Sequence, residues 1–284
     1  IEKELGLHLE EVQPRHFNQL KENSIETYKK TSTTDLSKEI FYYKNIPVTM
    51  RELFPALLDY DKTLFSWYEV EKIKGITASS IYVSDLMTPD LLKTIMDSII
   101  VIQTHLPNMK EKDTINIYAN YQQKLEKRYA NANYSLYSDH QKFFDEIKQK
   151  LHIYEESQLG RTTMIHGDPV FTNILINEYD EIKFIDMRGQ VGDKLTIYGD
   201  WLYDWAKVYQ SLIGYDHILL GKEIKPEYQE SLINYFLKYF TSIYSEKYIP
   251  YLKVITKSLL FSLLPLHKEK NAQLYGLLYS EYLD

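Results

Sequence analysis

Apolar residues change their spacing along this chain at about residue 75. Before that point, short apolar runs between polar clusters predict strands over 17–20, 25–30, 57–60 and 64–70, and one helix over 34–43. After it, helical spacing predicts helices over 89–106, 112–130, 137–156, 200–214, 226–244, 248–264 and 268–282, interrupted by an apolar hairpin over 163–187. The pattern therefore predicts an α+β fold with a small sheet lobe over 1–74, a larger helical lobe over 75–284, and a ligand site in the cleft between them.

The interrupting hairpin carries polar residues at both ends. Its strands are expected over 174–176 and 182–185, with a turn over 177–181. If Asn177 lies opposite Ile182, then Asn173 lies opposite Asp186, and paired residues share one face with Cβ atoms about 5 Å apart. An amide oxygen and a carboxylate at one point suit Mg²⁺. The prediction depends on register, because a slip of one residue would separate the two side chains.

A second acidic residue, Asp168, comes just before this hairpin. It precedes Pro169, which disfavours a helical conformation, so we expect it on an irregular loop where a base can face a bound hydroxyl. Each polar residue alone is common in turns. Together, Asp168, Asn173 and Asp186 follow the order of a base and two metal ligands in phosphoryl-transfer enzymes of the protein-kinase type.

Composition narrows the classes of partner and compartment. The chain has 284 residues, no cysteine and a net charge of −7, with no visible basic stripe. Nucleic acid is therefore not an expected partner, and disulfides, thiol nucleophiles and thiolate zinc sites are excluded. An acidic balance is compatible with a cationic substrate, although net charge says little about one site.

The same composition favours a cytoplasmic protein. Its longest apolar runs, 98–102 and 259–264, are too short to span a bilayer, and no signal peptide is visible. The first residue is Ile1 rather than Met, so we expect that an upstream part of the chain is missing. The sequence does not predict an oligomeric state.

Three motifs carry a family resemblance. They are the runs 165–175 (IHGDPVFTNIL), 184–189 (FIDMRG) and 199–207 (GDWLYDWAK). With them the chain resembles the aminoglycoside phosphotransferase and choline kinase family, which has a protein-kinase-like two-lobed fold. The form Phe-Ile-Asp-x-Arg-Gly is most similar to phosphotransferases of bacterial surface-polysaccharide loci.

The resemblance assigns roles to the residues of the first two motifs. It implies that Asp168 is the catalytic base or orients the acceptor hydroxyl, and that Asn173 and Asp186 bind Mg²⁺. His166 would pack the catalytic loop. Arg188 would reach a phosphate or an anionic acceptor, with a surface position or a loop-bracing role as equal alternatives.

The third motif is expected to support the loop and contact the acceptor. By the resemblance, Asp200 would hydrogen-bond the backbone of the catalytic loop. Asp204 and Trp205 would lie against the acceptor, where an aromatic ring beside a carboxylate could hold an ammonium group or stack on a sugar. A merely solvated Asp204 is the alternative.

The small lobe should supply a lysine for the nucleotide phosphates and a glutamate to hold it. Lys30 is favoured over Lys29 because it directly precedes the turn at 31–32, and strand neighbours face opposite sides; the alternative is that both are surface lysines. Glu39 is the expected partner. Backbone groups from Glu71 to Ile73 would meet a purine.

These roles together predict transfer of the γ-phosphoryl group of ATP or GTP to a hydroxyl of a small acceptor. The candidate acceptors are a sugar, an amino alcohol such as choline, or an aminoglycoside, and the polysaccharide-locus resemblance favours a sugar. One departure supports an alternative: the hairpin before Lys30 contains no glycine. A pseudokinase-like nucleotide-binding or scaffold module is therefore the second hypothesis.

Overall fold

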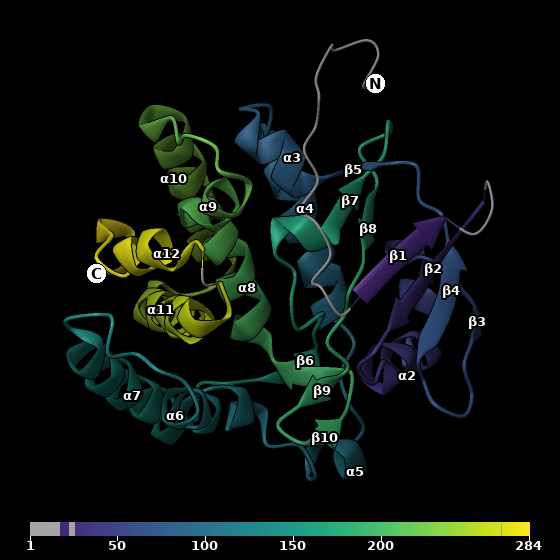
Figure 1. Ribbon diagram of the computed structural model, residues 1–284, viewed down its shortest axis with the longest axis horizontal. Coiled ribbons are helices and arrows are strands. Elements are labelled where there is room, and N and C mark those ends of the chain that lie inside the picture. Colours follow the sequence, from purple (N-terminus) through teal and green to yellow (C-terminus); the bar gives the residue numbers. More distant parts are fainter. Residues whose placement is uncertain (1–17, 23–25, 268) are drawn as a thin grey trace.

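The computed structural model describes residues 18–22, 26–267 and 269–284 (Figure 1). Its small lobe is a four-stranded antiparallel sheet with one helix packed against it. In spatial order the strands are β1 (Asn18–Glu22), β2 (Thr27–Ser32), β4 (Trp67–Glu71) and β3 (Leu57–Tyr60), and the helix is α2 (Ser37–Asn45). Tyr43 of α2 packs on Tyr68 of β4, with ring centroids 5.5 Å apart.

Most predicted elements of this lobe are present with shifted ends. The hairpin of β1 and β2 forms, although its turn at 23–25 lies outside the described residues. The predicted helix begins at Ser37 rather than at 34, because the side chain of Asp35 accepts hydrogen bonds from the Ser37 N–H and hydroxyl and holds the preceding bend.

The large lobe combines ten helices of the described residues with short strands. The helices are α3 (Ala78–Val83), α4 (Pro89–Gln103), α5 (Met109–Lys112), α6 (Gln122–Ala130), α7 (His140–Glu156), α8 (Trp201–Gln210), α9 (Asp216–Leu220), α10 (Pro226–Ile243), α11 (Ile249–Leu263) and α12 (Asn271–Leu277). The strands are β5 (Ile76–Thr77), β6 (Thr162–Met164), β7 (Ile174–Ile176), β8 (Ile182–Phe184), β9 (Gln190–Val191), β10 (Lys194–Leu195) and β11 (Tyr198–Asp200). The single helix predicted over 112–130 is wrong: the side chain of Asn116 accepts from the Tyr118 N–H and starts a separate 3₁₀ turn.

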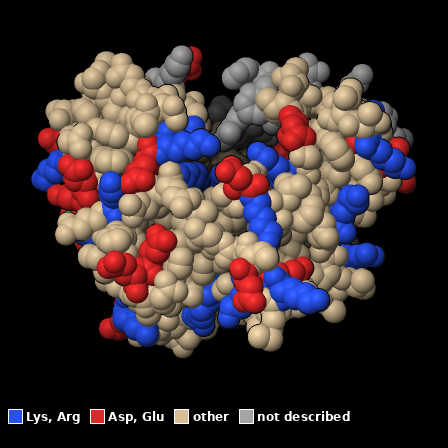
Figure 2. All heavy atoms as spheres, turned by 90° about the horizontal axis from the view of Figure 1, so that it is seen from below, with Lys and Arg blue, Asp and Glu red and all other residues tan. Residues whose placement is uncertain are grey.

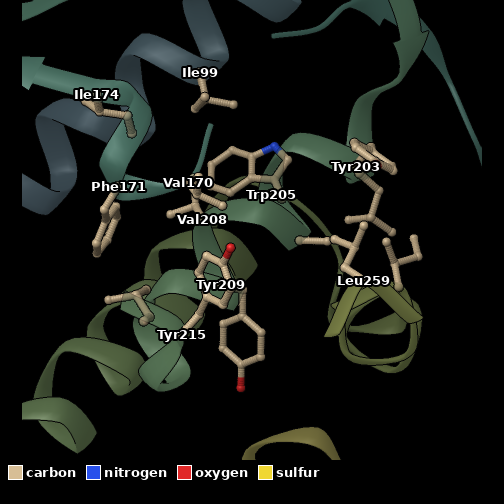
Figure 3. Packing of buried hydrophobic residues seen from close by; sticks show 14 of the residues in the cluster. Ile99, Val170, Phe171, Ile174, Tyr203, Trp205, Val208, Tyr209, Tyr215 and Leu259 are labelled. Atoms are coloured by element: carbon tan, nitrogen blue, oxygen red, sulfur yellow. The ribbon is translucent and has the colours of Figure 1, made fainter. Parts of the chain in front are cut away.

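Helix α8 runs through the centre of this lobe, and all ten of its residues are buried. Figure 3 shows its Trp205 and Tyr209 between Ile99 of α4 and Leu259 of α11. Trp205 packs edge-on against Phe240 of α10, with ring centroids 5.3 Å apart. Because α8 is buried on every side, contacts with the surrounding core fix its position, and with it the positions of the segments before and after it.

One helical stretch of the described residues is long and apolar enough to cross a bilayer by length and composition alone. It covers Glu246–Leu266, 21 residues with a mean hydropathy of 1.3, and includes α11. In this structure 61% of its apolar window is buried, and α11 packs against α8 and α7. These contacts make it a core helix of the large lobe.

The connection between the lobes lies against the interrupting hairpin. Strand β5 follows Gly75 and pairs antiparallel with β7, with Ile76 opposite Ile176. A Cβ atom on Gly75 would lie 2.8 Å from the carbonyl oxygen of Ile176, closer than real side chains approach. Glycine is therefore required for this linker to lie flat on β7.

A second close approach joins α2 to the loop after β8. Gly189 has a φ of +60°, and a Cβ atom there would overlap the carbonyl oxygen of Lys38 in α2. Because Lys38 precedes Glu39 directly in α2, this packing fixes how closely Glu39 approaches the loop.

Replacing Gly189 with alanine should push α2 away from this loop. We expect Gly189→Ala to lower the free energy of unfolding by at least about 2 kcal/mol, from backbone overlap and an unfavourable positive φ. Urea unfolding measures the change. The matched control is Gly276→Ala, where no atom lies within 4 Å and alanine favours the helix; equal stability of the two variants would contradict the close packing.

Candidate active site

A buried lysine links three elements at the junction of the two lobes. Lys30 of β2 is only 5% exposed, and its Nζ lies 2.8 Å from Oε2 of Glu39 and 2.8 Å from Oδ1 of Asp186. The hydroxyl of Tyr68 also donates to Glu39. Burial disfavours the charged form of Lys30, but the two carboxylates outweigh it and raise its pKa.

The neighbouring lysine takes a different environment. The Nζ of Lys29 lies 3.6 Å from the centroid of the Trp67 ring, so it makes a cation–π contact. Since adjacent strand residues point to opposite faces, only Lys30 reaches Glu39.

The predicted register of the β7–β8 hairpin is wrong by one residue. The pairs are Ile174 with Phe184 and Ile176 with Ile182, so Asn177 lies opposite Glu181 rather than Ile182. The cause is turn chemistry: the side-chain oxygen of Asn177 accepts the N–H groups of residues 179 and 181 and tightens the turn.

This register places Asn173 opposite Ile185, whose N–H donates to the Asn173 carbonyl at 3.0 Å. Pairing of the two strands therefore does not bring Asn173 and Asp186 together. Asp186 instead leaves the strand with a φ of +59°, and its carboxylate, 46% exposed, contacts Lys30. Asn173 donates its amide N–H to the carbonyl of Asp168 at 2.9 Å, which leaves its side-chain oxygen as the atom suited to a cation.

A metal in this site would need ligands beyond the protein. Among the described residues there is no cluster of three or more His, Asp or Glu side chains able to hold an ion. One amide oxygen and one carboxylate fit Mg²⁺, which takes few protein ligands and completes its shell with water and phosphate oxygens.

The loop between β6 and β7 presents Asp168. Its side chain is 34% exposed, and its Oδ1 lies 2.8 Å from Nζ of Lys207 in α8. Burial works against ionisation, but Lys207, with Arg188 and His166, lowers the pKa of Asp168 to about 2. Asp168 is therefore a carboxylate at neutral pH, ready to accept a hydrogen bond.

His166 ties this loop to the end of β8. Its Nδ1 accepts the N–H of Asp168 at 3.1 Å, so its Nε2 carries the proton and donates to the carbonyl of Ile185 at 3.0 Å. The ring is fully buried, and burial lowers its pKa to about 4. A neutral histidine with both nitrogens in use positions the loop.

The predicted acceptor contacts of Asp204 and Trp205 are wrong. Asp204 is fully buried, and its two oxygens accept the N–H groups of His166 at 2.7 Å and Gly167 at 2.8 Å. Trp205 is also fully buried and donates its Nε1–H to Gln103. Both lie in the core because α8 is covered on all sides, which its local sequence does not reveal.

The loop-supporting role predicted for Asp200 belongs to Asp204, one helical turn later. Asp200 accepts the hydroxyl hydrogens of Tyr121 and Tyr154 and, at 3.0 Å, the N–H of Arg161. It joins the start of α6, α7 and the start of α8 rather than the loop that carries Asp168. Burial raises its pKa to about 6.

The residues expected to contact a purine lie at and just after the end of β4. The N–H of Glu71 donates to Ala56, and the N–H of Lys72 donates to Glu26. These two groups serve the small lobe itself. Ile73, two residues further along the linker, stays a prediction for backbone contact with a base.

Two lysines near Asp168, Lys124 and Lys207, were not singled out from the sequence, whereas Arg188 was. Lys207 contacts Asp168, while Lys124 donates to the hydroxyl of Tyr203 at 2.9 Å. Arg188 donates to the same hydroxyl at 3.3 Å. Lys207 follows Asp204 by three residues on α8, so helical spacing alone could have placed both on the face toward the loop that carries Asp168.

Comparisons with known proteins address the fold. Neither a protein-family model nor a curated protein sequence matches the chain. Among solved structures, choline kinase LicA from Streptococcus pneumoniae has a TM-score of 0.60 at 13% identity, covering 94% of this chain and 90% of its own. A thermostable variant of aminoglycoside phosphotransferase APH(4)-Ia, in complex with ADP and hygromycin B, has a TM-score of 0.61 at 13% identity, covering 92% and 91%.

A glucosamine kinase has a TM-score of 0.59 at 11% identity, covering 89% of this chain and 72% of its own. The chain therefore has the two-lobed α+β fold of these small-molecule kinases, and the predicted fold class is confirmed. At such identities the likeness concerns the fold, so activity must be argued from the site.

Changing Asp204 should loosen the loop between β6 and β7 that carries Asp168. In Asp204→Asn, one acceptor oxygen becomes an NH₂ group that faces a buried backbone N–H, at a cost of about 1–3 kcal/mol. We expect hydrogen–deuterium exchange to speed up in peptides covering His166 and Gly167. Asp193→Asn, the same change at an exposed turn, should leave their protection unaltered; retained protection in Asp204→Asn would contradict the bracing role.

The environment of Asp200 predicts a pH dependence of stability. Its folded pKa of about 6 exceeds its ordinary value of 3.8, so its contribution is complete below about pH 4 and is lost as pH rises through 6. Asp200→Asn cannot titrate. Between about pH 4 and 6.5, the unfolding free energy of the variant should therefore gain about 1–3 kcal/mol relative to the unchanged protein.

Urea unfolding at the two pH values tests this. A constant difference between the two proteins across that range would show that Asp200 is ionised in the fold.

Proposed function

We propose that this chain is a small-molecule kinase, which transfers the γ-phosphoryl group of a nucleoside triphosphate to a hydroxyl of a small acceptor. The observation that supports this most is the meeting of Lys30, Glu39 and Asp186, with both ion pairs at 2.8 Å. Enzymes of the protein-kinase type need a lysine–glutamate pair and an acidic metal ligand in place together. The fold neighbours are named as phosphotransferases and kinases, and one was crystallised with ADP and hygromycin B.

Asn173 and Asp186 are the residues that would hold Mg²⁺, whose positive charge would offset the negative charge of the phosphates. Lys30 would then exchange its contact with Asp186 for a phosphate oxygen while Glu39 keeps it in place. The backbone near Ile73 would receive the base. Lys30 thus acts as the positive group that the small lobe adds to the phosphates.

Asp168 would orient the acceptor. The hydroxyl oxygen forms a bond to the γ-phosphorus as the bond to the bridging β–γ oxygen breaks, and the nucleoside diphosphate leaves with that electron pair. The hydroxyl proton passes to Asp168. Because Lys207 keeps the pKa of Asp168 at about 2, the carboxylate is a weak base, so its contribution is mainly positioning, with the proton taken late.

We infer a sugar or an amino alcohol as acceptor and ATP or GTP as donor. The resemblance of residues 184–189 to phosphotransferases of surface-polysaccharide loci supports a sugar hydroxyl. A nucleoside triphosphate as co-substrate agrees with a cytoplasmic reaction.

The test is a transfer assay with ATP or GTP, Mg²⁺ and a panel of sugars and amino alcohols, read by mass spectrometry. We expect one acceptor class to gain a phosphoryl group. Asp168→Asn should reduce the transfer rate by about 10²–10⁴-fold, the usual range for a proton-accepting group, while nucleotide still binds. The exposed Asp193→Asn should transfer at the rate of the unchanged protein.

Two results would count against the proposal. Nucleotide binding without transfer to any member of a broad panel would favour the pseudokinase-like module. A retained rate in Asp168→Asn would remove Asp168 from the mechanism. Asp186→Ala gives an independent check, because its transfer should no longer respond to Mg²⁺.

A further inference from the structure

Three cationic side chains from separate elements converge beside Asp168. Lys124 of α6 and Arg188, from the loop after β8, both donate to the hydroxyl of Tyr203, at 2.9 and 3.3 Å. Lys207 of α8 lies 2.8 Å from Asp168. The basic cluster, defined as Lys124, Arg188 and Lys207, therefore surrounds two neighbouring oxygens next to the position of the reacting hydroxyl.

This basic cluster carries more positive charge than its surroundings balance. Among the described residues, Asp168 is the one carboxylate in direct contact with it. Nearby acids have other partners: Asp186 and Glu39 contact Lys30, and Glu126 contacts Lys148. Asp204, which lies within electrostatic reach of Lys207, accepts two backbone N–H groups. Three cations against the two carboxylates of Asp168 and Asp204 leave a local excess of positive charge.

The pKa of Tyr203 reflects the same excess of positive charge. Its burial alone would raise the pKa of its hydroxyl, but Lys124, Arg188 and Lys207 together lower that pKa to about 8. For Lys124, burial and then the charge of Arg188 lower the pKa to about 8. The shift of the Tyr203 pKa has the direction expected where positive charge lacks an anion, whereas burial is the main cause of the shift at Lys124.

One member of the cluster, Lys124, also lines a cavity of about 850 Å³, to which Arg188, Lys207 and Asp168 do not contribute. Lys124, Lys127 and Arg128 line it with Asn131 and Asn133, and none of its lining residues is acidic. Figure 2 shows one face of the molecule, on which basic and acidic side chains both lie beside a central hollow.

We propose that the acceptor is an anion, a hydroxyl compound that already carries a phosphate or carboxylate group, bound by Lys124 and Arg188 with its free hydroxyl toward Asp168. This rests on the proposed function, since it names the substrate class for the same site. Phosphate and carboxylate are the groups that arginine and lysine bind best. The preference is opposite to that expected for choline or an aminoglycoside, whose ammonium groups the basic cluster repels.

The binding test uses four probes that share a sugar ring and differ in charge: glucose 6-phosphate, glucuronate, glucose and glucosamine. We expect the two anions to bind at least about 10-fold more tightly than glucose by isothermal titration, and glucosamine to bind no better than glucose. The preference should weaken with added salt. The phosphate and carboxylate arms identify which anionic group the site takes.

The variants separate a binding role from a structural one. Lys124→Gln and Arg188→Gln should each lose about 10-fold in affinity for the anionic probe, whereas Lys124→Arg, which keeps the charge, should retain it. Lys148→Gln, an exposed lysine of α7, is the matched control and should bind like the unchanged protein. In the transfer assay, the Gln variants should raise the KM of the acceptor and leave the KM of the nucleotide unchanged.

Equal binding of glucose and the anionic probes, or tighter binding of glucosamine, would overturn the anion proposal. A raised KM for nucleotide alone would do the same, because it would assign the basic cluster to the donor phosphates. Transfer to a neutral sugar with no charge preference would leave the kinase function standing without it. Tight anion binding with no transfer to any acceptor would support the charge preference and reject the kinase function.

Discussion

The ammonium group of Lys30 is the constraint on which the site depends. A lysine with 5% exposure stays charged only if carboxylates lie against it, and here one comes from α2 and the other from the loop after β8. These two segments must therefore remain close together in this state. Gly189 allows this, because the absence of a side chain lets Lys38 of α2 rest directly on the loop.

Helix α8 is the second support of the site, and it acts from within the core. Asp204 holds the backbone of the loop between β6 and β7, and Lys207, one turn further on, contacts the side chain of Asp168 in that loop. The same helix thus fixes both the path of the loop and the ionisation of Asp168. His166 completes the arrangement by joining that loop to the end of β8.

Much of this fold could be predicted from local sequence, and the exceptions have specific physical causes. The spacing of apolar residues located the β1–β2 and β7–β8 hairpins and most long helices, and the Lys30–Glu39 spacing pointed to an ion pair that the structure contains. The register failed because Asn177 caps its own turn. Asp204 and Trp205 were misplaced because burial of α8 on every side comes from distant helices. The contact of Lys124 with Tyr203 joins positions 79 residues apart, which no local pattern encodes.

The linker between the lobes has a mechanical consequence. Strand β5 is hydrogen-bonded to β7, and Gly75 lies pressed against Ile176. The small lobe is therefore hinged on the same hairpin that carries Asn173 and leads to Asp186. A change in the angle between the lobes would therefore be transmitted through β5 to the hairpin, and with it to the spacing of the groups that would hold the cation.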